Sequence, residues 1–155
     1  MNLIKKILLV LLIVFIAIQF IQPAWNTNGQ VLPTDISKTV YVPQNVQSLL
    51  QIACYDCHSN NTIYPWYAYM QPIGWILANH IKNGKKELNF SDFGSYSIRK
   101  QQSKLKAIAD QIKDGEMPPC SYTIIHKNAR LSKEQKALIV DWAEKAQDSL
   151  SQKNP

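Results

Sequence analysis

Apolar residues follow two different patterns along this chain. Near the N-terminus they form one run: the stretch "KKILLVLLIVFIAIQFIQPAW" begins with Lys5 and Lys6 and is apolar from Ile7 to Ile21, except for Gln19. Beyond this run, apolar residues recur at intervals of three and four, which is the spacing of one face of an α-helix. The sequence therefore predicts one helix that is apolar all round, followed by amphipathic helices.

Four later segments carry the amphipathic pattern, and local residues indicate where they begin or end. Pro43 suits the first position of a helix, whereas Gly84 and Gly115 are typical residues at helix ends. Ser132 and Gln135, three residues apart, form a capping box before the last helix. These signals and the apolar stripes predict helices within residues 43–53, 71–84, 96–115 and 131–150.

The predicted fold is all-α, because no alternating β pattern of useful length and no internal repeat occurs in the sequence. About four helices are joined by long loops, and loops of this length in a small domain usually need something to pack around. We expect three regions: a signal anchor or transmembrane helix over residues 1–24, a linker over 25–42 and one domain over 43–150.

The N-terminal segment has the basic flank and apolar run of an export signal. The apolar run comes close to the length of about 18 residues that is usual for a membrane helix. No small-x-small cleavage site follows it, so we expect an uncleaved anchor with its basic end inside and Trp25 near the outer interface. A cleaved signal peptide is the alternative. Either interpretation places residues 26–155 outside the cytoplasm, whereas a buried core helix does not suit so apolar a segment.

The stretch "CYDCHSNNTIYPWY" contains Cys54, Cys57 and His58, and three chemistries use such a pattern. A redox dithiol normally accompanies a βαβ pattern, and no strands are predicted here. A structural zinc site needs four ligands. His80, His126 and Cys120 offer further ligands, but their spacings match no usual zinc pattern. The third chemistry, c-type haem attachment, has Cys-x-x-Cys-His as its signature.

Haem attachment explains the spacing of these residues. Residues three and four apart share one face of a helical turn. Cys54 and Cys57 can therefore each form a thioether with a haem vinyl group, while His58 lies beneath the iron as an axial ligand. The sequence predicts one covalently bound haem c.

The second axial ligand of the iron is expected to be a methionine or a second histidine. Met117 lies in "DGEMPP" between the third and fourth predicted helices, where Pro118 and Pro119 stiffen the backbone. A stiff loop can hold a weak iron–sulfur bond at a small ordering cost. His80, on the apolar side of the second helix, and His126, in a loop, are the alternatives.

The stretches "CYDCHSNNTIYPWY", "LNFSDF", "MPPCSYTIIHKNARLS" and "LIVDWA" together resemble the haem-binding domain family of small bacterial exported proteins, which are cytochrome-c-like. The resemblance covers roughly residues 41–145. It implies covalent haem at Cys54 and Cys57, an axial role for His58, and Met117 as the better candidate for the sixth ligand. The chain departs from mitochondrial-type cytochromes c at Cys120, a thiol that we expect to be buried.

These observations predict a membrane-tethered monohaem c-type cytochrome that passes single electrons to protein partners. We expect it at the bacterial inner membrane with its haem domain on the periplasmic side, or free in the periplasm if the N-terminal segment is cleaved. Without Lys5 and Lys6 the chain has 15 basic and 11 acidic residues, and this mildly basic balance suits a solvated helical surface or a docking face for an acidic redox partner. No basic-aromatic pattern indicates nucleic-acid binding.

Two other functions are compatible with a haem motif of this kind. A haem-based sensor or small-ligand binder needs a sixth ligand that a gas displaces, and this is the main alternative. A peroxidase needs an open iron and polar groups beside it, and nothing in the sequence places such groups there. We therefore do not expect an enzyme.

Overall fold

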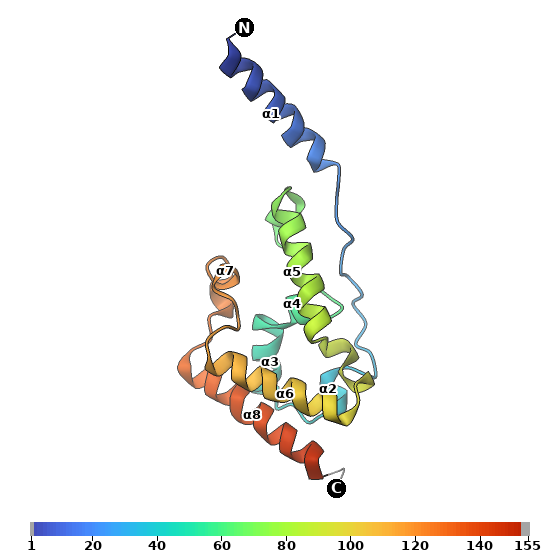
Figure 1. Ribbon diagram of the computed structural model, residues 1–155. Coiled ribbons are helices and arrows are strands. Elements are labelled where there is room, and N and C mark those ends of the chain that lie inside the picture. The colour runs from blue at the N-terminus through green and yellow to red at the C-terminus, as the bar shows by residue number, and fades with distance from the viewer. Residues whose placement is uncertain (1, 153–155) are drawn as a thin grey trace.

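The computed structural model describes residues 2–152, and these form helices joined by loops (Figure 1). The described residues contain one isolated β-bridge, between Thr27 and Asn61, and no strand. The predicted all-α fold is confirmed. In chain order the elements are α1 (Leu3–Gln19), α2 (Ile36–Thr39), α3 (Gln44–Ala53), α4 (Tyr55–His58), η1 (Trp66–Tyr69), α5 (Ile73–Glu87), η2 (Phe90–Ser95), α6 (Ile98–Lys113), α7 (Cys120–Thr123), η3 (Lys127–Ala129) and α8 (Lys133–Gln152).

The hydrophobic core forms where α6 and α8 run side by side and α3 packs on them (Figure 1). Leu50 of α3, Leu105 of α6 and Ile139 of α8 are fully buried. Burial of each such side chain contributes about 1.5–3 kcal/mol relative to leaving it exposed. The core therefore fixes α3, and with it the motif that follows α3, above the α6–α8 pair.

Helix α6 ends as the sequence predicts. Gly115 has a φ of +76°, the left-handed conformation in which glycine is favoured. Its N–H donates to the Ile112 carbonyl at 3.2 Å, and the Glu116 N–H donates to the Gln111 carbonyl at 3.0 Å. These two bonds form a Schellman motif, which satisfies the last carbonyls of the helix and turns the chain sharply.

The capping box of α8 is also present. The Ser132 hydroxyl accepts from the Gln135 N–H at 3.2 Å, and the Gln135 side chain accepts from the Ser132 N–H at 2.8 Å. Each residue thus accepts a hydrogen bond from the backbone N–H of the other, and two N–H groups at the start of the helix gain partners. Local sequence alone is sufficient to set this helix start.

Gly84 does not end α5, because the helix continues to Glu87. The glycine instead allows close packing: a Cβ atom there would lie 2.7 Å from the Cys57 carbonyl oxygen and 3.3 Å from the Cys57 Cβ. Any larger residue would push α5 away from α4. The prediction of a helix stop at Gly84 was therefore wrong, since the residue serves a contact between two helices.

Part of the segment expected to be a linker packs into the core. Ile36 of α2 is fully buried and Val40 is nearly so. Asp35 caps α2 by accepting from the Ser37 N–H at 2.9 Å. Residues 36–40 therefore belong structurally with the helical body, and their pattern is too short to show a helical period.

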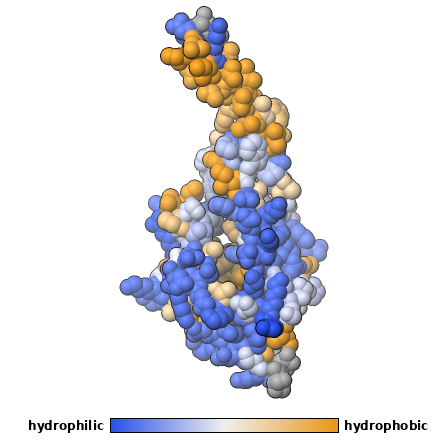
Figure 2. All heavy atoms as spheres, in the orientation of Figure 1, coloured by the Kyte–Doolittle hydropathy of each residue, from blue (hydrophilic) through white to orange (hydrophobic). Residues whose placement is uncertain are grey.

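Helix α1 projects from the rest of the chain as an apolar rod (Figures 1 and 2). It has 17 residues. At a rise of about 1.5 Å per residue it is about 26 Å long, shorter than the roughly 30 Å hydrocarbon core of a bilayer. Within residues 2–152, no helix is long and apolar enough to cross a membrane. The expected transmembrane helix over residues 1–24 is therefore not supported.

The end of α1 is held against the start of α5 by hydrogen bonds. The Gln19 side chain accepts from the Gln71 N–H at 2.9 Å and donates to the Gln71 carbonyl at 3.2 Å. The buried Gln71 side chain donates to Gln22 at 3.0 Å, and the Trp75 indole N–H donates to the Ile21 carbonyl at 2.8 Å. These hydrogen bonds therefore join the apolar helix to the domain.

Candidate functional site

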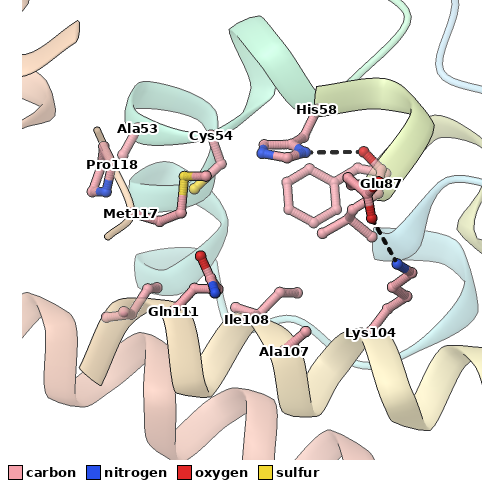
Figure 3. A pocket seen from close by; sticks show the side chains of 13 residues that line it. Ala53, Cys54, His58, Glu87, Lys104, Ala107, Ile108, Gln111, Met117 and Pro118 are labelled. Carbon is pink, nitrogen blue, oxygen red and sulfur yellow. Dashed lines mark hydrogen bonds and ion pairs between the residues drawn. The ribbon is translucent and has the colours of Figure 1, made fainter. Parts of the chain in front are cut away.

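A cavity of about 290 Å³ lies between the α3–α4 segment, α6 and the loop after α6 (Figure 3). Cys54, His58 and Met117, all singled out from the sequence, line it together. Most of the remaining wall is apolar, formed by Ala53, Leu88, Phe90, Ile108, Ile112 and Pro118. An apolar cavity with a few soft donors suits a large flat organic group that carries a metal.

The Cys-x-x-Cys-His motif forms one turn of helix directly after α3. The N–H groups of Cys57 and His58 donate to the Cys54 carbonyl at 3.2 and 2.9 Å. Cys54 and His58 therefore stand on one face and both line the cavity. Cys57 is not among the lining residues and lies against Gly84 of α5.

Both thiols of the motif are free and partly buried, and neither is poised as a thiolate. Burial, and next the charge of Cys57, raises the pKa of Cys54 to about 12. Burial, and next Asp56, raises the pKa of Cys57 to about 11. Reactive dithiols instead have lowered pKa values. These surroundings disfavour a redox dithiol.

The His58 ring is fixed in one tautomer. Its Nδ1 lies 3.0 Å from the Leu88 carbonyl oxygen, which only accepts, so Nδ1 carries the hydrogen. Nε2 then has a free lone pair, and Figure 3 shows this nitrogen on the cavity side of the ring. Burial lowers the pKa of His58, against the opposing effect of its backbone hydrogen bonds. A neutral imidazole with an oriented Nε2 is the form that ligates metal.

The segment that supplies the Leu88 carbonyl is bonded to the residues that follow His58. The Asn60 N–H donates to the Ser91 hydroxyl at 3.0 Å, and the Asn89 side chain donates to the Asn60 side chain at 2.9 Å. Asn89 also accepts from the Ser91 N–H at 3.1 Å. The "SNN" and "LNFS" stretches thus form one polar unit that holds the carbonyl opposite His58.

Met117 reaches the cavity because of the turn at the end of α6. Its N–H donates to the Gln111 carbonyl at 3.2 Å, next to the bonds of the Schellman motif. The chain therefore folds back over α6, and the partly buried Met117 side chain packs on the core. In Figure 3 this side chain enters the cavity from a different segment than His58 does.

The two histidines considered as alternative ligands lie outside the lining of the cavity. His80 lies on the same side of α5 as Ile73 and Ile76, as its spacing predicts, but this apolar side is exposed and does not face the cavity. The Nε2 atom of His126 lies 2.6 Å from the Tyr67 hydroxyl. Cys120, expected to be buried, is exposed because it starts the short surface helix α7. Among residues 2–152, no three His, Cys, Asp or Glu side chains come together as a metal group.

Sequence reasoning missed a charged pair beside the cavity. Lys104 of α6 and Glu87 at the end of α5 both line it, with Nζ and Oε2 3.7 Å apart (Figure 3). The Lys104 side chain is only 23% exposed, whereas that of Glu87 is 75% exposed. No local pattern marks these residues, because they meet only through the packing of two helices.

Comparison with known proteins agrees with this geometry. Residues 13–145 match the family described as Haem-binding domain. No curated protein and no solved structure matches the chain. The chain belongs to the haem-binding domain family, and haem is its expected ligand.

Proposed function

We propose that this chain binds one haem covalently through Cys54 and Cys57 and carries single electrons, with His58 and Met117 as the axial ligands. One observation carries the proposal: a neutral imidazole with Nε2 facing an apolar cavity that Cys54 and Met117 also line. The donor set fits haem iron, for which His and Met are common axial ligands. Bound haem supplies reversible exchange between Fe(III) and Fe(II).

The residues around the cavity have separate tasks in this proposal. The Leu88 carbonyl orients His58 and raises its basicity as a ligand. The thioether of Met117 is a soft donor, which raises the reduction potential relative to a second imidazole. The apolar wall lowers the local dielectric and excludes water, which favours the less charged ferrous state. Each of these effects acts on the potential, the property an electron carrier must set.

Voltammetry of the haem-loaded full chain tests this function. We expect a reversible one-electron wave, and a lower potential in Met117→Ala because the sulfur ligand is lost. Met70→Ala is the matched control, since Met70 is 43% exposed and does not line the cavity. Haem that cannot be cycled reversibly, or that binds carbon monoxide rapidly and stoichiometrically when reduced, contradicts electron transfer and favours the ligand-binding alternative.

We also propose that the domain works outside the cytoplasm, attached to the inner membrane of a bacterium through α1, with a protein redox partner. The exposed apolar surface of α1 and its hydrogen-bonded junction at Gln71 support attachment. Three aromatic residues cluster near that junction: the ring centroid of Trp25 lies 4.5 Å from that of Tyr64 and 4.8 Å from that of Tyr69. Such aromatics favour membrane interfaces. Fractionation of cells expressing the full chain tests this: recovery in the cytoplasm contradicts it.

A further inference from the structure

One hydrogen bond joins the segment of Met117 to the haem-attachment motif. The Tyr122 hydroxyl donates to Oδ2 of Asp56 at 2.7 Å, across 66 residues of sequence. Asp56 lies between Cys54 and Cys57, and Tyr122 follows Met117 by five residues. The bond therefore links the two sides from which the proposed axial ligands come.

Asp56 is itself held in place. Its Oδ1 accepts from the Ile63 N–H at 3.0 Å, and its backbone carbonyl accepts from the Thr62 hydroxyl at 2.6 Å. With one carboxylate oxygen occupied on its own segment, the other is free to accept from Tyr122. Burial, and next the hydrogen bond to Asp56, raises the pKa of Tyr122. The hydroxyl therefore stays protonated and remains a donor.

The other side of Tyr122 is also supported. The His126 ring stacks on the Tyr122 ring, with centroids 4.2 Å apart and planes 11° apart. His126 in turn is in hydrogen-bond contact with Tyr67 of η1. The short helix α7 packs chiefly on η3, which belongs to the same segment. The contacts of Tyr122 and His126 are thus the main polar ties between this segment and the rest of the domain.

Met117 lies between two fixed points along the chain. On one side, its N–H and that of Glu116 are bonded to the Gln111 carbonyl. On the other side, Tyr122 is bonded to Asp56. Farther along the chain, η3 packs on α3 with Ala129 fully buried. Loss of the Tyr122–Asp56 bond would therefore leave the residues between Met117 and η3 without this tie, and the exposed residues Cys120, Ile124 and Ile125 add little packing there.

We propose that Tyr122 is a positioning residue that, through its hydrogen bond to Asp56, keeps Met117 in place as the sixth ligand. This rests on the proposed function, since it concerns the same iron. We call the hydrogen-bonded Tyr122–Asp56 pair the latch. A latch of this kind sets how readily an external ligand displaces Met117.

Imidazole binding to the haem-loaded, oxidised full chain tests the latch. Tyr122→Phe removes only the hydroxyl and keeps the ring that stacks on His126. A hydrogen bond to a charged group contributes about 1.5–3 kcal/mol. Displacement of Met117 loses at most that energy, so we expect imidazole to bind about tenfold more tightly in this variant, with a weaker Met-to-Fe(III) charge-transfer band. Tyr41→Phe, at a side chain that is 84% exposed, is the control and should match the wild type.

A second background separates positioning from a general structural effect. In Met117→Ala there is no methionine to displace, so adding Tyr122→Phe should leave imidazole affinity unchanged. An increase of similar size in both backgrounds overturns the latch. Imidazole affinity of Tyr122→Phe within twofold of the wild type, with the charge-transfer band unchanged, overturns it as well.

Asp56→Asn covers the case in which Tyr122→Phe does not load haem. The amide keeps an acceptor oxygen but loses the charge, so we expect a smaller increase in imidazole affinity, because neutral hydrogen bonds are about half as strong. An affinity equal to that of the wild type overturns the latch. If the wild type itself lacks the charge-transfer band, the proposed function fails and the latch fails with it.

Discussion

The two sides of the cavity are held in very different ways. His58 is partly buried on a helical turn, with its ring bonded to Leu88 and with α5 packed closely at Gly84. Met117 belongs to a segment that carries exposed residues and is tied down by a few hydrogen bonds. One proposed ligand is therefore fixed by close packing of helices, whereas the segment that carries the other is held by less packing and by a few polar contacts.

We expect the largest effect when both proposed attachment cysteines, Cys54 and Cys57, are removed. In Cys54→Ala with Cys57→Ala, no thioether can form, so we expect haem to be lost completely on denaturation. The measurement is haem staining after denaturing electrophoresis. Cys120→Ala is the control and should retain haem fully. Haem that stays attached in the double variant contradicts covalent attachment at this motif.

In the haem-free chain, the reactivity of the thiols reports how far the motif is buried. With pKa values of about 12 and 11, Cys54 and Cys57 are almost wholly protonated at neutral pH. We expect iodoacetamide to modify them at least about tenfold more slowly than an ordinary exposed thiol, after allowing for the greater nucleophilicity of high-pKa thiolates. Mass spectrometry of timed samples, with the exposed Cys120 as internal reference, measures the rates. Equal rates at all three cysteines contradict the burial of the motif.

A methyl group added between α4 and α5 should weaken the fixed side. In Gly84→Ala the new Cβ meets the Cys57 carbonyl oxygen at 2.7 Å. We expect the free energy of unfolding to fall by about 1–3 kcal/mol, as for other overpacked sites. Urea unfolding measures it. Gly29→Ala is the matched control, since its Cβ would have no neighbour closer than 3.9 Å. Equal stability of both variants would mean that α5 does not press on the motif.

The smallest effect on stability is expected at Cys120, which is exposed in the segment after Met117. Cys120→Ser changes a surface side chain at the start of α7. We expect the free energy of unfolding to change by less than about 0.5 kcal/mol, which is usual for surface substitutions. Chemical unfolding of the haem-loaded chain measures this change. A loss of several kcal/mol would show that α7 packs more firmly than its exposure indicates.

The sequence predicts those features that depend on neighbours in the chain. The capping box at Ser132, the end of α6 at Gly115 and the turn of Cys54 and His58 all follow from local patterns. The helical periods also identify the core helices, although the apolar Leu138 of α8 is 42% exposed.

What the sequence leaves open depends on residues that are distant in the chain. The bond from His58 to Leu88, the approach of Gly84 to Cys57 and the bond from Tyr122 to Asp56 are set by tertiary packing. A helical period shows which residues share one face of a helix. It does not show which other helix or loop that face contacts. The same reason explains why the apolar side of α5 that carries His80 is exposed although its pattern resembles that of a buried face.

The proposal depends above all on His58 and Met117, which would both ligate the iron of one bound haem. The visible and near-infrared spectrum of the haem-loaded full chain, oxidised and reduced, tests it most directly. We predict low-spin haem with the weak Met-to-Fe(III) charge-transfer band, lost in Met117→Ala and kept in Met70→Ala. High-spin haem in the wild type, or a low-spin spectrum that Met117→Ala leaves unchanged, would contradict the claim.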